Sequence, residues 1–318
     1  MRGTGFLMLA FACAVSNAAW AADCKPLNIV SILDMTPIDR SGVVTIPISL
    51  NGTQKDFLLD TGGVYPQVTS KVAEELKLPQ HRSNVEFYSA DGSLSRTAAL
   101  VHDFTMGKLR ASDMDLQISP GGEEIMSPVA FPSYDFEMNF AARKLNILSS
   151  DHCEGKVIYW QSQALAVVPI KIRDFHVEVP VKLDGKDFTA IIDTGTSRST
   201  IRQDVARSAF DLTSTSAGMT PAGHLGSDEQ AVIYTYPFKT LTFEGVTIGN
   251  PKIAILPNIM GKNADQTHKM NTLIGRNSDD IALPEVIVGM DVLAKLHLYF
   301  AFKEHKLYIT EAAAAPAP

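Results

Sequence analysis

Two aspartates, Asp60 and Asp193, stand in the same local sequence and could together carry out acid–base chemistry. Each follows three apolar residues and begins the tripeptide Asp-Thr-Gly. An apolar triplet is typical of a strand buried on both faces, and the glycine lets the backbone turn where the strand ends. Two carboxyls held close together share one proton, so one can take a proton from water while the other donates one. The pattern predicts a hydrolytic pair that titrates as a unit.

The residues before each aspartate are also repeated, and they define the elements that must position the carboxylates. The offset between the aspartates (193 − 60 = 133) also superposes the segments 46–52 and 179–185 without a gap. Both segments alternate apolar and polar residues up to Asn-Gly or Asp-Gly, which is a strong hairpin signal. We therefore predict that the return strand of a β-hairpin delivers each aspartate. Self-similarity at so long a period indicates a duplicated domain rather than a solenoid.

A second, polar hairpin follows each repeat and is a candidate lid over the site. In the first copy, residues 87–94 predict two strands around an Asp-Gly turn. In the second copy, a Gly-Ser pair follows a stretch rich in Ser, Thr, Gly and Ala, which predicts a longer and looser lid. The alternative is an ordinary surface hairpin. The candidate lid residues are Tyr88, Asp91, Gly92, Ser93, Gly226 and Ser227.

The N-terminal residues are typical of a targeting segment that is removed from the mature protein. Arg2 precedes the apolar stretch Phe6–Val15, and Ala19-Trp20-Ala21 matches the small-residue pattern of a cleavage site. The stretch is too short to cross a bilayer as a stable helix, and no other stretch is long and apolar enough. We expect residues 1–21 to be a signal peptide, and the mature chain to be periplasmic or secreted without stable membrane insertion.

Composition excludes several classes of function. The 318 residues carry a formal net charge of −7 and no basic stripe, so we expect no nucleic-acid partner. The eight histidines show no His-Glu-x-x-His spacing, and there is neither a Gly-x-Ser-x-Gly elbow nor a phosphate-binding loop. We therefore expect no metal and no cofactor. With 45% hydrophobic residues the chain can bury an ample core, and we expect a monomer.

Two cysteines, Cys24 and Cys153, remain after the expected export. An even pair in an oxidising compartment is more often bridged than free. We predict a disulfide that ties the N-terminal arm to the region between the two copies. The alternative is two unpaired structural thiols.

The repeat divides the chain into two lobes. We place the first lobe at 22–150, a connector at 151–163, the second lobe at 164–311 and a frayed tail at 312–318. Helices are predicted at 70–78, where Pro79 follows, at 202–210 and near 291–296. Inside the connector, Val157–Trp160 is predicted to be a strand that bridges the lobes.

The paired Asp-Thr-Gly loops, each after an apolar strand and before a possible lid, resemble those of the two-lobed aspartic proteases of the pepsin and retropepsin clan. The lobes are shorter than those of pepsin, so the chain is most similar to exported bacterial retropepsin-like proteins. The resemblance implies an all-β, bilobal, duplicated acid-protease β-barrel fold with short helices and an active cleft between the lobes. It also implies an aspartic endopeptidase whose partner is a peptide or protein substrate.

The same resemblance implies roles for the residues around each aspartate. Thr61 and Thr194 would brace the two loops against each other, and Gly62 and Gly195 would allow close backbone approach. The lid residues would cover an extended peptide, which would pair with them as an added strand. The second copy continues with Thr196 and Ser197, as in the pepsin-type motif.

The first copy departs from this pattern. Val64 stands where the second copy has the hydroxyl of Ser197. Aligning the ends of the two copies places Ser127, followed by Pro128, opposite Gly289 of the second copy. These departures motivate a second hypothesis, in which the chain is a catalytically impaired peptide-binding or scaffold protein that keeps the protease fold. Retention of both aspartates favours the enzyme, because a binding protein has no need of a paired charge.

Overall fold

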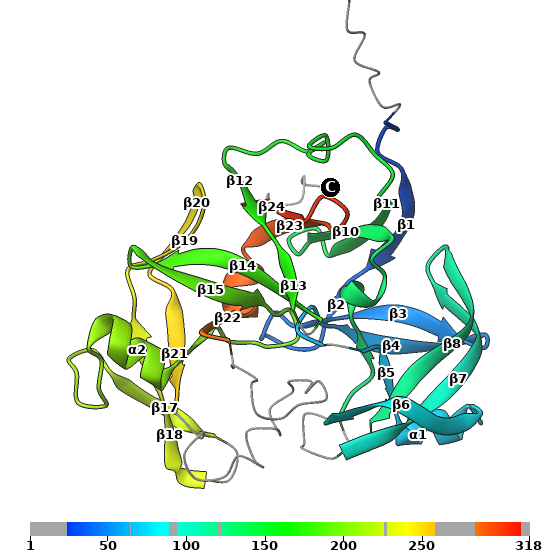
Figure 1. The fold of residues 1–318 in the computed structure, drawn as a ribbon, viewed down its shortest axis with the longest axis horizontal. Helices are drawn as coiled ribbons and strands as arrows, with labels where there is room; N and C mark the ends of the chain where they lie inside the picture. Colours follow the sequence, from blue (N-terminus) through cyan, green and yellow to red (C-terminus); the bar gives the residue numbers. More distant parts are fainter. Residues whose placement is uncertain are drawn as a thin grey trace, which may run out of the picture.

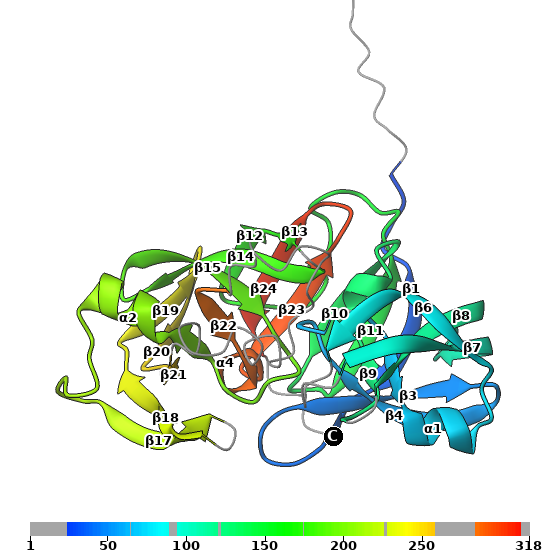
Figure 2. The ribbon, with the colours of Figure 1, turned by 60° about the horizontal axis from the view of Figure 1, so that its bottom comes forward.

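The computed structural model describes residues 24–63, 65–88, 94–119, 122–173, 175–225, 228–257 and 284–312. The expected signal peptide, Val64, residues 313–318 of the expected tail, and the lid residues Asp91, Gly92, Ser93, Gly226 and Ser227 lie outside them. Two β-rich lobes lie side by side, with a further sheet above the middle of the molecule (Figures 1 and 2). The predicted all-β duplicated fold with short helices is confirmed.

The first lobe is built on an eight-stranded sheet. Its strand β3 alternates between buried and partly exposed residues, and Ile46, Ile48 and Leu50 of that strand are fully buried. This is the period-two pattern of a strand with one face in the core. The strands, in their order across the sheet, are β2 (Thr36–Pro37), β3 (Val44–Leu50), β4 (Thr53–Leu59), β9 (Ile125–Met126), β5 (Gln67–Thr69), β8 (Leu109–Ser119), β7 (Leu94–Met106) and β6 (Gln80–Tyr88).

The second lobe is built on a ten-stranded sheet with the same central arrangement. The strands on the main path, in order, are β17 (Thr220–Leu225), β18 (Asp228–Pro237), β21 (Lys252–Leu256), β16 (Thr200–Arg202), β22 (Val286–Val288), β15 (Lys186–Ile192), β14 (His176–Leu183), β19 (Thr240–Phe243) and β20 (Val246–Gly249). Strand β13 (Lys171–Arg173) pairs with β14.

The repeated sequence forms the same hairpin in both lobes. Strands β3 and β4 pair antiparallel from Leu50↔Thr53, and β14 and β15 pair from Leu183↔Lys186. The turn residues Asn51 and Gly52 have φ of 49° and 85°, and Asp184 and Gly185 have φ of 46° and 80°. Two successive positive φ angles are what a two-residue type I′ turn requires, which explains why Asn-Gly and Asp-Gly stand there.

A six-stranded sheet joins the lobes. Its order is β1 (Ile29–Asp34), β11 (Lys144–Ser149), β10 (Tyr134–Asn139), β23 (Leu296–Ala301), β24 (Lys306–Glu311) and β12 (Leu165–Pro169). The first three strands come from the first copy and the last three from the second, so the β10–β23 pairing is the seam between them. Across this seam Phe136 lies opposite Phe300 and Met138 opposite Leu298, all of them buried.

The helices are short and begin close to the predicted positions. Helix α1 (Ser70–Glu75) is capped by the Thr69 hydroxyl, which accepts from the Val72 amide at 3.2 Å. It ends earlier than predicted, because Lys77 has a left-handed backbone with φ of 50°. Helix α2 covers Gln203–Phe210. Helix α4 (Met290–Leu293) is also shorter than predicted, since Leu296 already belongs to β23.

The connector does not contain the predicted strand. Val157–Trp160 is irregular, and the lobes are bridged by the six-stranded sheet instead. The reason is packing, because the apolar residues of the connector cover the outer face of that sheet rather than extend it. Val157 is buried with Leu148, Tyr299, Ala301 and Tyr308.

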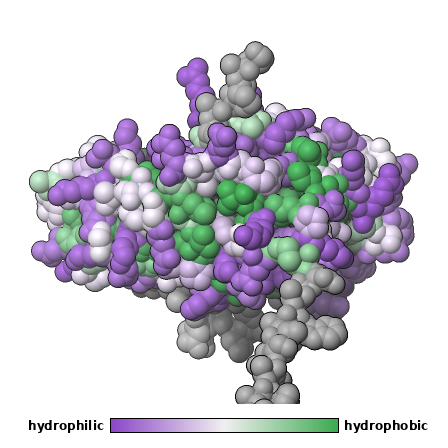
Figure 3. Space-filling model, turned by 90° about the horizontal axis from the view of Figure 1, so that it is seen from above, coloured by the Kyte–Doolittle hydropathy of each residue, from purple (hydrophilic) through white to green (hydrophobic). Residues whose placement is uncertain are grey.

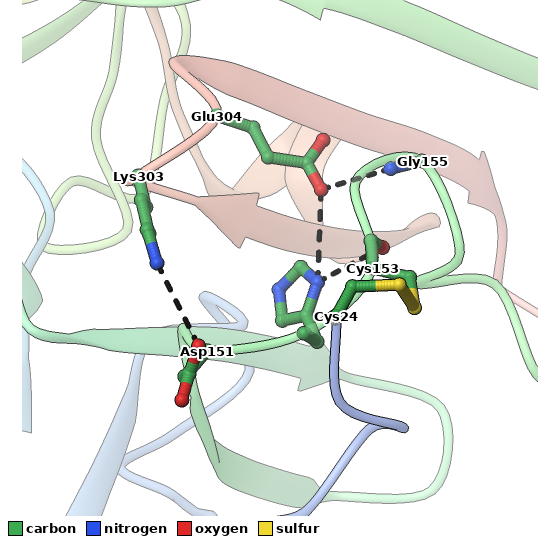
Figure 4. The surroundings of a disulfide bond; sticks show 7 residues. Cys24, Asp151, Cys153, Gly155, Lys303 and Glu304 are labelled. Carbon is green, nitrogen blue, oxygen red and sulfur yellow. Dashed lines mark hydrogen bonds and ion pairs between the residues drawn. A yellow bond between two sulfur atoms is a disulfide. The ribbon is translucent and has the colours of Figure 1, made fainter. Parts of the chain in front are cut away.

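The predicted disulfide between Cys24 and Cys153 is present, with the two Cα atoms 4.7 Å apart and a sequence separation of 129 residues. It anchors the connector to the chain segment that leads into β1. On one side of it Asp151 forms ion pairs with Lys25 at 2.5 Å and Lys303 at 3.9 Å, and on the other side lie Glu304 and Gly155 (Figure 4).

The side of the molecule that carries the six-stranded sheet exposes apolar side chains. Figure 3 looks onto this side and shows apolar surface gathered across its middle. Ile29 and Ile32 of β1 are 41% and 58% exposed, and Leu165 and Val167 of β12 are 45% and 37% exposed. Among the described residues, no helix is both long enough and apolar enough to cross a membrane.

Candidate active site

Each aspartate follows a buried strand that is flanked by a parallel neighbour. In the first lobe β4 runs parallel to β9, and the amide of Asp60 donates to the carbonyl of Met126 at 3.0 Å. In the second lobe β15 runs parallel to β22, and the amide of Asp193 donates to the carbonyl of Val288 at 3.0 Å. The two backbones are therefore held in the same way, as the repeated sequence predicts.

The threonines of the two tripeptides hold the loops together across the lobes. The hydroxyl of Thr61 donates to the carbonyl of Ile192 at 2.7 Å and accepts from the amide of Thr194 at 3.1 Å. Reciprocally, the hydroxyl of Thr194 donates to the carbonyl of Leu59 at 2.7 Å and accepts from the amide of Thr61 at 3.0 Å. Both threonines are fully buried, so all four hydrogen bonds are shielded from water.

The glycines bring each carboxylate against the loop of the opposite lobe. A Cβ atom added at Gly62 would lie 2.6 Å from Oδ2 of Asp193, and one added at Gly195 would lie 2.5 Å from Oδ1 of Asp60. These separations are shorter than any real Cβ contact, so no other residue fits at either position without a shift. The two carboxyls meet at this crossing, where they interact electrostatically.

Burial and backbone donors set the electrostatics of the pair. Oδ1 of Asp60 accepts from the amides of Gly62 and Gly63, both at 2.8 Å, and Oδ1 of Asp193 accepts from the amide of Gly195 at 2.9 Å. Burial raises the pKa of both carboxyls, and the charge of Asp60 raises the pKa of Asp193 further. The arrangement therefore favours a single proton held by the pair.

The loop of the second lobe is braced by a second carboxylate. Oδ1 of Asp291, in the first turn of α4, accepts from the amide of Ser199 at 2.9 Å and from its hydroxyl at 2.6 Å. The same hydroxyl accepts from the amide of Gly289 at 3.0 Å. A Cβ at Gly289 would lie 2.6 Å from the carbonyl carbon of Arg198, so glycine is required here.

Thr196 and Ser197 contribute through their backbones. The carbonyl of Thr196 accepts from the amide of Met290 at 2.9 Å, and that of Ser197 accepts from the amide of Asp291 at 3.2 Å. The loop that follows Asp193 is thereby tied directly to α4. Burial is the largest influence on the pKa of Asp193 and raises it, whereas the backbone of Thr196 lowers it.

Among its described residues, the first lobe has no such brace. Strand register places Ser127 where the second lobe has Gly289, because Leu59 pairs with Met126 as Ile192 pairs with Val288. Ser127 is fully buried, and its hydroxyl has no hydrogen-bond partner among the described residues. A short 3-10 helix, η1 (Pro128–Ala130), follows it in place of α4. Tyr88 ends β6, and the other candidate lid residues lie outside the described part of the chain.

Sequence reasoning missed three residues that act on the site. Ser199 and Asp291 form the brace, and the only signal for them was a serine shortly after one Asp-Thr-Gly and an aspartate shortly after Gly289. His176 lies at the start of β14 and makes a small electrostatic contribution that lowers the pKa of Asp60, against the larger effect of burial, which raises it. Nothing local in the sequence links it to Asp60.

Comparison with known proteins gives a family and a fold. A family model described as aspartyl protease matches residues 46–128 and 179–292. The crystal structure of an aspartic proteinase from Irpex lacteus is similar, with a TM-score of 0.52, 12% identity, and coverage of 92% of this chain and 99% of that chain. The crystal structure of Basic 7S globulin from soybean has a TM-score of 0.49 and 11% identity, and covers 91% and 96% of the two chains. No curated protein sequence matches the chain.

Proposed function

Because the chain belongs to the aspartyl protease family, we propose that it is an aspartic endopeptidase that hydrolyses peptide bonds outside the cytoplasm with Asp60 and Asp193 as its catalytic pair. The observation that carries this proposal is the crossing of the two loops. Each carboxylate lies against the glycine of the opposite lobe, and four buried threonine hydrogen bonds fix the crossing.

The geometry supports a mechanism in which the pair handles all proton transfers. One carboxyl is ionised and the other protonated, and a water bound between them loses its proton to the ionised oxygen as it attacks the peptide carbonyl. The protonated carboxyl donates its proton to the carbonyl oxygen. The tetrahedral intermediate then breaks at its C–N bond as a proton reaches the leaving nitrogen, and the pair returns with one proton. The backbone amides of Gly62, Gly63 and Gly195 hold the carboxyl oxygens in place throughout.

The lid residues, the bound peptide and export of the chain are parts of the same proposal. An extended peptide would lie under the lids that contain Tyr88, Asp91, Gly92, Ser93, Gly226 and Ser227 and would pair with a lid strand through its backbone. Export would follow from removal of residues 1–21. The disulfide supports an oxidising compartment, where such bridges persist.

Peptide cleavage by the purified protein tests the proposal. The chain from residue 22 is incubated with a mixed peptide library from acidic to neutral pH, and products are identified by mass spectrometry. Asp60→Asn and Asp193→Asn should each abolish cleavage, because an amide cannot share the proton. Asp56→Asn is the matched control, since Asp56 lies on β4 as well but is exposed. Cleavage that survives either substitution contradicts the proposal, and bound but uncleaved peptides would indicate the binding protein instead.

A further inference from the structure

A second buried acid lies on the seam between the lobes, far in sequence from both catalytic aspartates. Asp135 of β10 is fully buried. From the second lobe, the amide of Phe302 donates to its Oδ1 at 3.2 Å and the hydroxyl of Tyr299 donates to its Oδ2 at 3.1 Å. Its remaining partner is His152 of the connector, whose Nε2 lies 2.5 Å from Oδ2. This acid therefore links both lobes and the connector.

The hydrogen-bond partners of His152 require a proton between its Nε2 atom and the carboxylate of Asp135. Nδ1 of His152 lies 3.2 Å from the carbonyl oxygen of Cys153 and 3.7 Å from Oε1 of Glu304. Both oxygens accept and neither donates, so Nδ1 must carry a hydrogen. A second proton must then lie between Nε2 and the carboxylate, on either the ring or the acid. With one proton fewer, a nitrogen lone pair would face a carboxylate in a buried site.

The surroundings favour keeping that proton. Burial raises the pKa of Asp135, and the opposing contribution of His152 is smaller. The side chain of His152 is 2% exposed, so water cannot replace a lost partner. Among the described residues, Tyr299 and Glu304 contact the pair directly, and Tyr308 and Lys306 contact Glu304 in turn. Asp151 and Tyr308 also interact electrostatically with the pair.

The connector is attached at several points, and this contact is one of them. Cys153 follows His152 directly and is covalently bound to Cys24, and the amide of Gly155 donates to Oε1 of Glu304 at 3.0 Å (Figure 4). Further along, Trp160 stacks on the ring of His297 with centroids 3.9 Å apart. Residues 151–163 thus lie across the β10–β23 seam, fastened at one end by a disulfide and by a buried pair.

We propose that Asp135 and His152 form a proton-holding positioning pair, which fastens the connector over the lobe seam and releases it when the shared proton is lost. The lobes each supply one catalytic aspartate, so a loosened seam also disturbs the crossing of their loops. This last step rests on the proposed function, whereas the release itself does not.

The sign of the pH effect follows from the raised pKa. A carboxyl whose pKa is higher in the folded protein than its ordinary value stabilises the fold at pH values below that ordinary pKa. This contribution to stability disappears as the pH rises through the folded-state pKa. The connector, residues 151–163, therefore stays attached to the sheet at acidic pH and detaches as the pH increases. The disulfide keeps the opened segment tethered.

Hydrogen exchange read by mass spectrometry tests the release directly. We expect amide exchange in residues 151–163, corrected for its intrinsic pH dependence, to increase at least about tenfold as the pH is raised from acidic to alkaline values. Asp135→Asn should abolish this increase. An asparagine nitrogen at the Oδ2 position donates to a neutral His152 ring and to the Tyr299 oxygen, so no titratable proton is needed. A connector that stays protected at high pH in the native protein would overturn the proposal.

A second variant and an activity profile complete the test. His152→Gln should expose the connector to exchange at every pH, because a neutral amide cannot satisfy Asp135, the Cys153 carbonyl and Glu304 together. In peptide cleavage at an alkaline pH where the native connector exchanges freely, Asp135→Asn should retain a higher kcat/KM than the native protein, with no matching difference at acidic pH. A purely structural loss would instead lower kcat/KM at all pH values, and equal kcat/KM of the two proteins at that alkaline pH would refute the positioning role. The exchange experiment needs no cleavage, so absence of protease activity leaves its outcome interpretable.

Discussion

The hydroxyl of Thr194 is one of the two oxygen atoms that lock the aspartate loops together, and its removal has an effect that can be worked out from the structure. It donates to the carbonyl of Leu59 and accepts from the amide of Thr61. Thr194→Val keeps the shape of the side chain but leaves both backbone groups buried without partners. Thr194→Ser keeps the hydroxyl and loses only a methyl group.

The two substitutions should differ clearly in the free energy of unfolding. Each buried backbone group left without a partner costs about 1–3 kcal/mol, so Thr194→Val should cost about 2–6 kcal/mol. Loss of one buried methyl costs about 1 kcal/mol. The order of the two variants, rather than either value alone, tests the role of the hydroxyl.

Urea unfolding followed by circular dichroism measures both variants under the same conditions, and cleavage of one peptide measures kcat. We expect Thr194→Val to lower both stability and kcat far more than Thr194→Ser. If the serine variant is as impaired as the valine variant, the methyl group of Thr194 and not its hydrogen bonds holds the two loops together. The role assigned to the hydroxyl is then wrong.

Three further predictions concern the glycines, the disulfide and pH. Gly195→Ala should reduce kcat/KM by more than about 100-fold in a steady-state cleavage assay with the fold retained by circular dichroism, because its Cβ would meet Oδ1 of Asp60 at 2.5 Å. Replacing both Cys24 and Cys153 by serine should lower the free energy of unfolding by about 3–5 kcal/mol, as expected for a loop spanning 129 residues, and an unchanged unfolding midpoint would contradict this. Burial raises the pKa of both Asp60 and Asp193, so activity should persist at low pH and fall as the pH rises and the last shared proton leaves; a pH–rate profile that increases into the alkaline range would contradict this.

Much of the fold could be predicted because its signals are local. The alternation of Ile46, Ile48 and Leu50, followed by an Asn-Gly turn, predicts a hairpin from neighbouring residues alone, and the second copy repeats it. The strand ends at Asp60 and Asp193 followed from the same pattern. The connector strand was the wrong prediction, since an apolar run cannot distinguish a segment that joins a sheet from one that covers its face.

The sequence by itself determined the two aspartates, the hairpins that deliver them and the cysteines available to bridge, because short-range periodicity and turn chemistry encode these features. Only the tertiary structure decided that each carboxylate lies against the opposite glycine, that Asp291 braces Ser199, and that a buried histidine meets Asp135 under the connector. Those contacts join residues that are distant in the chain or belong to different elements. They exist because two β-lobes meet along one seam, and no spacing in the sequence specifies which side chains face each other there.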